Sequence, residues 1–202
     1  MFKAFYWIVR VLLFPFYRAR VEGKDHHPPG AAVLCSNHST NSDAVFLIMA
    51  NGPKGDYGFI AKDELFHIPV LRHVIRWLHA FPVKRDQQDL SAVKTAFSFL
   101  KQGKKLLIFP EGTRVKDGKS RRTGLPAEIK SGVAFFSHRA GVPLVPVYIP
   151  EGAKLFRNNT VRIGTPFLPA YDGRKPSAAE YAATAAELMK RIYSLKNGVL
   201  TE

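Results

Sequence analysis

Cysteine is nearly missing from this sequence, which contains only Cys35. One cysteine cannot form an intramolecular disulfide, so the chain gives no sign of an oxidising compartment. The cysteine and histidine spacings that hold structural zinc are missing as well. Cys35 itself lies in an apolar stretch, where a buried thiol is usually inert, and it remains only a rival nucleophile.

Acidic residues are also scarce, with 16 Asp and Glu against 30 Lys and Arg and a formal net charge of +14. Such an excess favours an anionic partner, which could be nucleic acid, anionic lipid or a phosphorylated or acidic substrate. Hydrophobic residues make up 46% of the chain and aromatic residues 12%, which excludes a disordered protein. A length of 202 residues allows one domain with a sizeable core.

The N-terminal stretch MFKAFYWIVRVLLFPFYRAR lacks a long uncharged run, because Lys3, Arg10 and Arg18 divide it. No part of it approaches the roughly 18–20 apolar residues of a spanning helix, and it does not resemble a signal peptide. On a helix the cations share one side, and aromatic residues cover much of the rest, which is typical of an interfacial helix. We predict a membrane-associating segment over residues 1–22 and one domain over 23–202. A helix of the soluble core is the alternative.

Apolar strand patterns alternate with amphipathic helix patterns along most of the chain. The predicted strands cover residues 31–36, 57–61, 80–85, 105–109, 143–149 and 161–167. The predicted helices cover residues 43–52, 63–78, 89–103, 129–141 and 177–195. This alternation predicts an α/β fold in which a mostly parallel or mixed sheet is flanked by helices. In such folds, sites lie in the loops beyond the carboxyl ends of the strands.

The polar stretch NHSTNSD interrupts an apolar pattern at residues 37–43. On a continuous helix His38 and Asp43 would be about 140° apart and could not touch. If the chain turns at STNS and a helix starts near Ser42, Asp43 can fold back toward the imidazole. A carboxylate on one ring nitrogen would make the other a general base. A structural histidine beside an ordinary helix cap remains the alternative.

A second polar stretch, EGTR, follows an apolar strand at residues 111–114. Gly112 permits a tight turn, and the planar guanidinium of Arg114 suits a phosphate group. Glu111 can accept hydrogen bonds from hydroxyl groups. A surface turn with a solvated arginine would have the same composition.

These two stretches together resemble the signatures of the glycerolipid acyltransferases, and among them the 1-acyl-sn-glycerol-3-phosphate acyltransferases. NHSTNSD fits the motif N-H-x-x-x-x-D, and FPEGTR fits the second signature. The block from Lys62 to Arg85 and the sequence IKSG, with Lys130, resemble further blocks of that family in the same order. The likeness covers roughly residues 30–165.

The resemblance implies acyl transfer from a thioester to the sn-2 hydroxyl of 1-acyl-glycerol-3-phosphate, giving phosphatidic acid. It implies His38 as general base and Asp43 as its orienting carboxylate, with no metal and no cofactor. The donor, acyl-CoA or acyl-acyl carrier protein, is a substrate. The expected substrate-binding residues are Glu111, Gly112, Thr113, Arg114, Arg85, Lys62 and Lys130.

Other readings of the sequence stay open. The acceptor could instead be glycerol-3-phosphate or another lysophospholipid. A basic lipid-binding or nucleic-acid-binding protein is the non-enzymatic alternative, although no nucleic-acid-binding signature is present. The basic loop after Arg114 could face anionic lipid, coenzyme A phosphates or an acidic carrier protein. We expect a peripheral or monotopic protein on the cytoplasmic face of the cell membrane, with membrane lipid as a partner.

Overall fold

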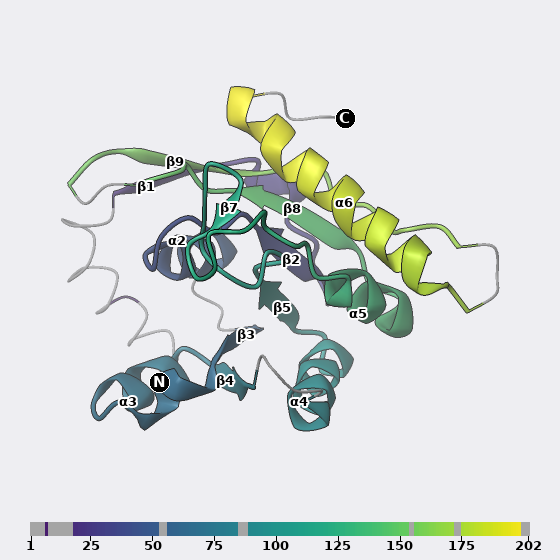
Figure 1. The fold of residues 1–202 in the computed structure, drawn as a ribbon, viewed down its shortest axis with the longest axis horizontal. Helices are drawn as coiled ribbons and strands as arrows, with labels where there is room; N and C mark the ends of the chain where they lie inside the picture. The colour runs from purple at the N-terminus through teal and green to yellow at the C-terminus, as the bar shows by residue number, and fades with distance from the viewer. Residues whose placement is uncertain are drawn as a thin grey trace.

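The computed structural model describes Trp7 and residues 18–52, 56–84, 89–153, 156–171 and 175–198. Its centre is a seven-stranded sheet in the order β1-β9-β8-β2-β5-β3-β4 (Figure 1). The strands in that order are β1 (Ala19–Glu22), β9 (Asn159–Ile163), β8 (Leu144–Tyr148), β2 (Val33–Ser36), β5 (Lys105–Ile108), β3 (Tyr57–Lys62) and β4 (Ala80–Val83). Strands β8 to β4 run parallel, and β9 is antiparallel to β8. The predicted α/β class with a mixed sheet is therefore confirmed.

Helices cover both faces of this sheet (Figure 1). Helix α2 (Asp43–Asn51) packs on one face, and α4 (Leu90–Lys101), α5 (Gly132–Ala140) and α6 (Ala178–Ser194) pack on the other. Strand β2 serves both layers, because Val33 and Cys35 join the cluster under α4–α6 while Leu34 joins the cluster under α2. Burial on both faces explains why β2 is apolar throughout instead of alternating.

Short elements complete the fold. The 3-10 helix η2 (Asp63–His67) and helix α3 (Leu71–Trp77) pack beside β3 and β4, with a break at the predicted position near Pro69. Two further 3-10 turns, η1 (Lys24–His26) and η3 (Leu195–Asn197), follow β1 and α6.

The chain leaves the neighbouring strands β2 and β5 in opposite directions. After β2 it passes through α2 on one face toward β3, and after β5 it passes through α5 on the other face toward β8. Where such connections diverge, a crevice opens at the carboxyl ends of the two strands. The stretch NHSTNSD follows β2 and the stretch EGTR follows β5, so both motifs reach this crevice.

The end of the predicted N-terminal segment differs from the prediction. Residues 19–22, which we assigned to the membrane-associating segment, form strand β1 and pair in parallel with β9. This strand is short and lies at the sheet edge, so it carries no clear alternation in its sequence. Residues 1–17 apart from Trp7 lie outside the described residues, and so does most of the predicted segment. Within the described part of the chain, no helix is long and apolar enough to cross a membrane.

The polar loop after β5 contains a small hairpin that the sequence analysis did not predict. Strands β6 (Val115–Lys116) and β7 (Lys119–Ser120) pair antiparallel across Asp117 and Gly118. Both turn residues have positive φ, 50° and 73°, as a type I′ Asp-Gly turn requires.

Candidate active site

His38 and Asp43 meet in the loop between β2 and α2. Nδ1 of His38 lies 3.1 Å from Oδ2 of Asp43, the contact that the sequence predicts. Asp43 is fully buried, and the His38 side chain is 14% exposed. Because an ionised carboxylate only accepts hydrogen bonds, the contact assigns a proton to Nδ1 and leaves the lone pair on Nε2. This is the orientation that a histidine base needs.

Asp43 also shapes the loop that carries His38. Its carboxylate accepts hydrogen bonds from the backbone N–H groups of Ser39 and Thr40, and from the Thr40 hydroxyl at 2.7 Å. The loop therefore wraps around a single buried carboxylate at the first residue of α2, where the helix dipole favours negative charge. One side chain thus sets both the loop conformation and the orientation of the imidazole.

The backbone of His38 is held in place by the segment that follows strand β5. Its N–H donates to Oε2 of Glu111 at 2.7 Å, and its carbonyl oxygen accepts from the N–H of Val115 at 2.7 Å. The imidazole stacks on Phe109, with ring centroids 4.1 Å apart and 15° between the ring planes. The segment after β5 therefore holds His38 by its ring, its N–H and its carbonyl group.

Glu111 is buried between His38 and helix α6. Its Oε1 atom accepts a hydrogen bond of 2.9 Å from the hydroxyl of Tyr193, while Oε2 accepts from His38. Burial raises the pKa of the Glu111 carboxyl to about 7, and the nearby charges of Asp43 and Glu151 act in the same direction. The two hydrogen bonds oppose this shift. Glu111 therefore changes its charge near neutral pH, next to the candidate base.

A pocket of about 290 Å³ opens beside Glu111, with Gly112 and Thr113 in its lining. Arg122 and Lys130 contribute cations to the same lining, and Glu128, which pairs with Lys130, contributes a carboxylate. Gly112 has a φ of 60°, and a Cβ there would lie 3.4 Å from Cγ of Lys130. Glycine thus permits both the turn and the close approach of the lysine stem. A pocket with two cations at its wall suits a phosphate group.

The four predicted cations lie in different places. Arg114 is exposed and is not among the residues that line the pocket. Lys62 ends β3, next to β5 in the sheet, and its Nζ lies 2.8 Å from Glu64. Lys130 lines the pocket while its Nζ lies 2.6 Å from Glu128. Arg85 lies outside the described residues.

Cys35 lies within β2 and is fully buried. Burial raises the pKa of its thiol far above the usual value, so a nucleophilic thiolate is disfavoured. Among the residues that the structure describes, no group of three or more His, Cys, Asp or Glu side chains is arranged to hold a metal ion.

Two residues near the site were missed by the sequence analysis. The Asn37 side chain donates to the carbonyl of Ile149 at 2.8 Å and accepts from its N–H at 2.9 Å, which ties the loop after β2 to the end of β8. Its place immediately before His38 is a signal that could have found it. Tyr193 lies 82 residues from Glu111, and nothing around it in the sequence marks it.

Comparisons with known proteins place the chain among acyltransferases. Residues 18–150 match the Acyltransferase family. A chloroplastic 1-acyl-sn-glycerol-3-phosphate acyltransferase of Brassica napus is 30% identical over 149 residues, which are 72% of this chain and 41% of the relative. The chain therefore spans about two fifths of the length of that relative. The 1-acyl-sn-glycerol-3-phosphate acyltransferase of Bacillus subtilis is 29% identical over 184 residues, 88% of each chain.

A solved structure agrees with this result. The crystal structure of the 1-acyl-sn-glycerophosphate acyltransferase PlsC from Thermotoga maritima matches with a TM-score of 0.66 and 28% identity. The match covers 96% of this chain and 78% of that one. Since the family match contains both the His38–Asp43 pair and the loop after β5, the chain belongs to the Acyltransferase family.

Proposed function

We propose that this protein transfers a fatty acyl group from a thioester to the sn-2 hydroxyl of 1-acyl-glycerol-3-phosphate. The observation that carries the proposal is the His38–Asp43 pair, clamped by the segment after β5 and beside a pocket with two cations. The named activity of the relatives supports the same acceptor. The product is phosphatidic acid.

In this proposal Nε2 of His38 removes the proton from the acceptor hydroxyl as its oxygen attacks the thioester carbonyl. The new ester C–O bond forms, the C–S bond breaks, and the leaving thiolate takes up the proton from His38. Asp43 holds Nδ1–H and stabilises the imidazolium that forms in between. The acyl group passes directly to the acceptor, without an acyl-enzyme.

The phosphate of the acceptor binds in the pocket next to Glu111. Lys130 and Arg122 line this pocket, and Gly112 and Thr113 bring their backbone against it. Arg114 lies in the same loop and is exposed. Its side chain either reaches the phosphate from the rim of the pocket or stays in solvent. Arg85 and Lys62 remain candidates for the same role.

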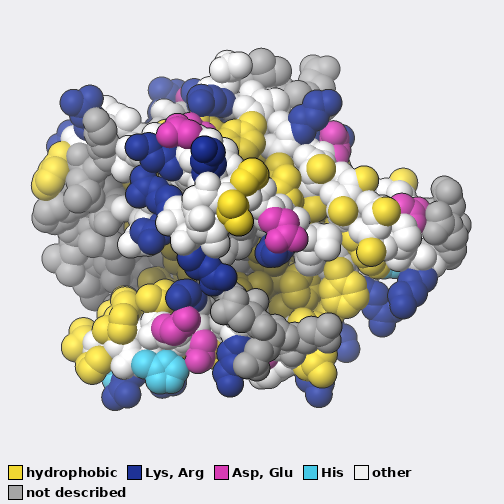
Figure 2. Space-filling model, viewed as in Figure 1, with side chains coloured by type: hydrophobic (Ala, Val, Ile, Leu, Met, Phe, Trp, Pro, Cys, Tyr) yellow, Lys and Arg dark blue, Asp and Glu magenta, His cyan; other side chains and the backbone are white. Residues whose placement is uncertain are grey.

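The acyl donor is acyl-CoA or acyl-acyl carrier protein, and the protein works at the cytoplasmic face of the cell membrane. Lys and Arg side chains gather over the β6–β7 hairpin (Figure 2). The exposed cations of this hairpin and the turn after it are Lys116, Lys119, Arg121 and Arg122. Positive charge of this kind is attracted to anionic lipid and to phosphorylated or acidic donors.

The test is acyl transfer by the purified full chain, supplied with acyl-CoA and lysophosphatidic acid in mixed micelles. We expect phosphatidic acid from the wild type. His38→Ala should lower kcat by on the order of 10²–10⁴-fold, which is the usual contribution of a general base. His67→Ala is the matched control, because this histidine is exposed and its Nδ1 lies 3.1 Å from the nearby carbonyl oxygen of Asp63.

Near wild-type turnover in folded His38→Ala would remove the general-base role. A parallel screen with glycerol-3-phosphate and with lysophospholipids of larger head group decides the acceptor. If one of these is turned over faster than lysophosphatidic acid, the acyltransfer chemistry stands and the acceptor is corrected.

A further inference from the structure

We propose that Tyr193 is a positioning residue of the reaction centre, which sets the place of the Glu111 carboxylate and, through it, the backbone of His38. The inference rests on the proposed function and deepens it. It also gives a role at the site to helix α6, which lies beyond the region that matches the family, residues 18–150.

The geometry is a short relay of two hydrogen bonds. The Tyr193 hydroxyl donates to Oε1 of Glu111 at 2.9 Å, and Oε2 of the same carboxylate accepts from the N–H of His38 at 2.7 Å. In the described part of the chain, Tyr193 gives the only side-chain hydrogen bond to Glu111. Each carboxylate oxygen therefore has one donor, and the two donors fix the rotation of the carboxylate plane.

Helix α6 holds the phenol firmly in place. Ile192 and Leu195, on either side of Tyr193, are fully buried in the core, and the Tyr193 ring packs at 6.5 Å from the ring of Tyr148. Burial, followed by the charge of Glu111, raises the pKa of the Tyr193 hydroxyl well above its usual value. The hydroxyl therefore stays protonated and acts as a donor to the ionised carboxylate.

The groups that face Glu111 divide into two sets. Asp43 at the start of α2 and Glu151 after β8 disfavour its negative charge, as burial does. The N–H of His38 and the Tyr193 hydroxyl favour it. Without the Tyr193 hydroxyl, one carboxylate oxygen would be buried without a donor, and Glu111 would hold its proton to higher pH. A protonated Glu111 is a poorer acceptor for the N–H of His38.

The first experiment compares the pH profile of acyl transfer in wild type, Tyr193→Phe and Tyr181→Phe. Tyr181 lies on the same helix and packs against Phe135 and Tyr171, which makes it the matched control. We expect Tyr193→Phe to lower kcat at pH 7 about five-fold or more, with KM for the acceptor little changed. The acidic side of its pH–activity profile should move to higher pH by roughly one unit, so that activity partly recovers near pH 9.

The second experiment follows the melting temperature against pH and does not depend on activity. In Tyr193→Phe, the decline of stability with rising pH should continue to higher pH than in wild type. In a Glu111→Gln background, Tyr193→Phe should leave the pH profile unchanged, because a residue acting through Glu111 has nothing left to act on.

The outcomes separate the two proposals. If wild type forms no ester with any acceptor, the proposed function fails, and the melting curves still decide whether Tyr193 controls Glu111. If wild type is active and Tyr193→Phe only lowers the melting temperature, with both pH profiles unmoved, the contact is structural and the positioning role is overturned.

Discussion

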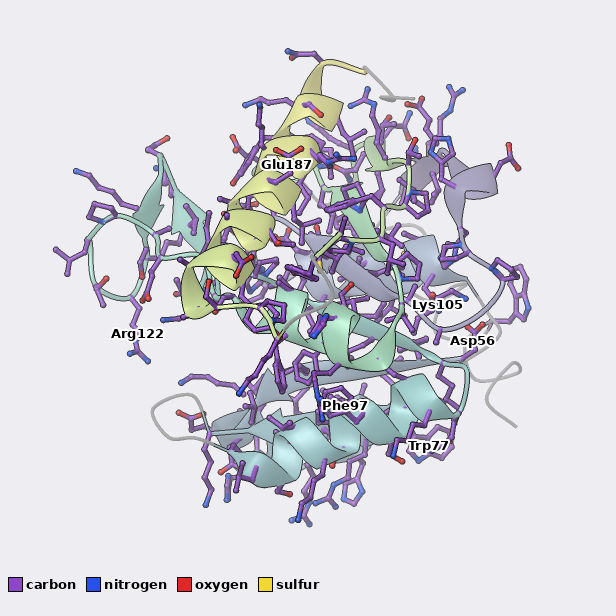
Figure 3. The ribbon with its side chains drawn as sticks, turned by 90° about the vertical axis from the view of Figure 1, so that its right-hand side faces the viewer. Asp56, Trp77, Phe97, Lys105, Arg122 and Glu187 are labelled. Atoms are coloured by element: carbon purple, nitrogen blue, oxygen red, sulfur yellow. The ribbon has the colours of Figure 1, made fainter. Side chains whose placement is uncertain are left out.

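Two acid–base pairs, one buried and one partly exposed, lie at opposite ends of the same sheet. At the carboxyl ends of the central strands, Asp43 lies 3.1 Å from His38, and at the amino ends, Asp56 lies 3.1 Å from Lys105. Figure 3 shows Asp56 and Lys105 together on one side of the molecule, opposite Arg122 on the loop after β5. The distance is the same, but the partner of the carboxylate differs.

The difference lies in the groups that surround each pair. Burial alone would raise the pKa of Asp56, but the hydrogen bond and charge of Lys105, with help from Asn51, lower it below its ordinary value. That ion pair ties the residue before β3 to the first residue of β5. At the other end, Glu111, whose carboxyl has a pKa of about 7, accepts a hydrogen bond from the backbone of His38, so a carboxyl beside that pair can change its charge near neutrality.

The largest expected effect separates the two aspartates by activity. Asp43→Asn should lower kcat by on the order of 10²–10⁴-fold, because an amide N–H pointing at Nδ1 would stabilise the wrong tautomer of His38. Asp56→Asn should leave kcat near that of wild type. Steady-state assays with lysophosphatidic acid measure both. If the two variants lost kcat equally, the two ends of the sheet would not differ in their role in turnover.

A smaller effect should appear in the pH dependence of stability. The folded-state pKa of Glu111, about 7, exceeds its ordinary value of 4.5, so between these values the folded state binds more protons than the unfolded state. Stability should therefore fall as the pH rises from about 4.5 to 7, by at most about 3 kcal/mol. Glu111→Gln should flatten this decline. Denaturant titrations at several pH values measure it, and an unchanged slope would contradict the assignment.

At the amino end, Lys105→Met should reduce the free energy of unfolding by about 1–3 kcal/mol, since it leaves Asp56 without its charge partner. Partial exposure of Asp56 keeps the loss below that of a fully buried pair. Turnover should stay near wild type at temperatures where the variant is folded. Lys104→Met, next to it in sequence, is a suitable control. A large loss of turnover in folded Lys105→Met would mean that the two ends are coupled.

The smallest effect concerns the start of α6, far along the helix from Tyr193. Ser177 and Glu180 form a capping box, with Ser177 Oγ accepting from the N–H of Glu180. Ser177→Ala should cost about 1 kcal/mol of stability and leave kcat unchanged. Thermal unfolding and the acyltransfer assay together check this. A drop in kcat would show that the far end of α6 also controls the site.

Much of the fold could be predicted because its strands are apolar and its helices amphipathic. The contact between His38 and Asp43 was also predictable, since turn residues separate them. The predicted helix start near Ser42 is confirmed, since α2 begins at Asp43, although the Ser42 side chain makes no capping hydrogen bond. Strand β1 and the β6–β7 hairpin were missed because both are too short to show a periodic pattern.

The contacts that hold His38 in place could not be predicted from local sequence. Its partner Glu111 lies in the turn after β5 and Val115 begins β6, while Tyr193 comes from helix α6, which reaches the site only through tertiary packing. Such contacts depend on strand order, which the pattern of single elements does not specify. The ion pairs of Lys62 with Glu64 and of Lys130 with Glu128 are local instead, since each joins residues two positions apart.

The contacts that hold His38 in place have a consequence for how the protein folds. The contacts from Glu111 to His38 and to Tyr193 join residues 73 and 82 positions apart. Contacts of such separation form late, after the loops between them have closed. A partly folded chain would therefore lack the oriented imidazole of His38, and under the proposed function it would not consume the acyl donor before the site is complete.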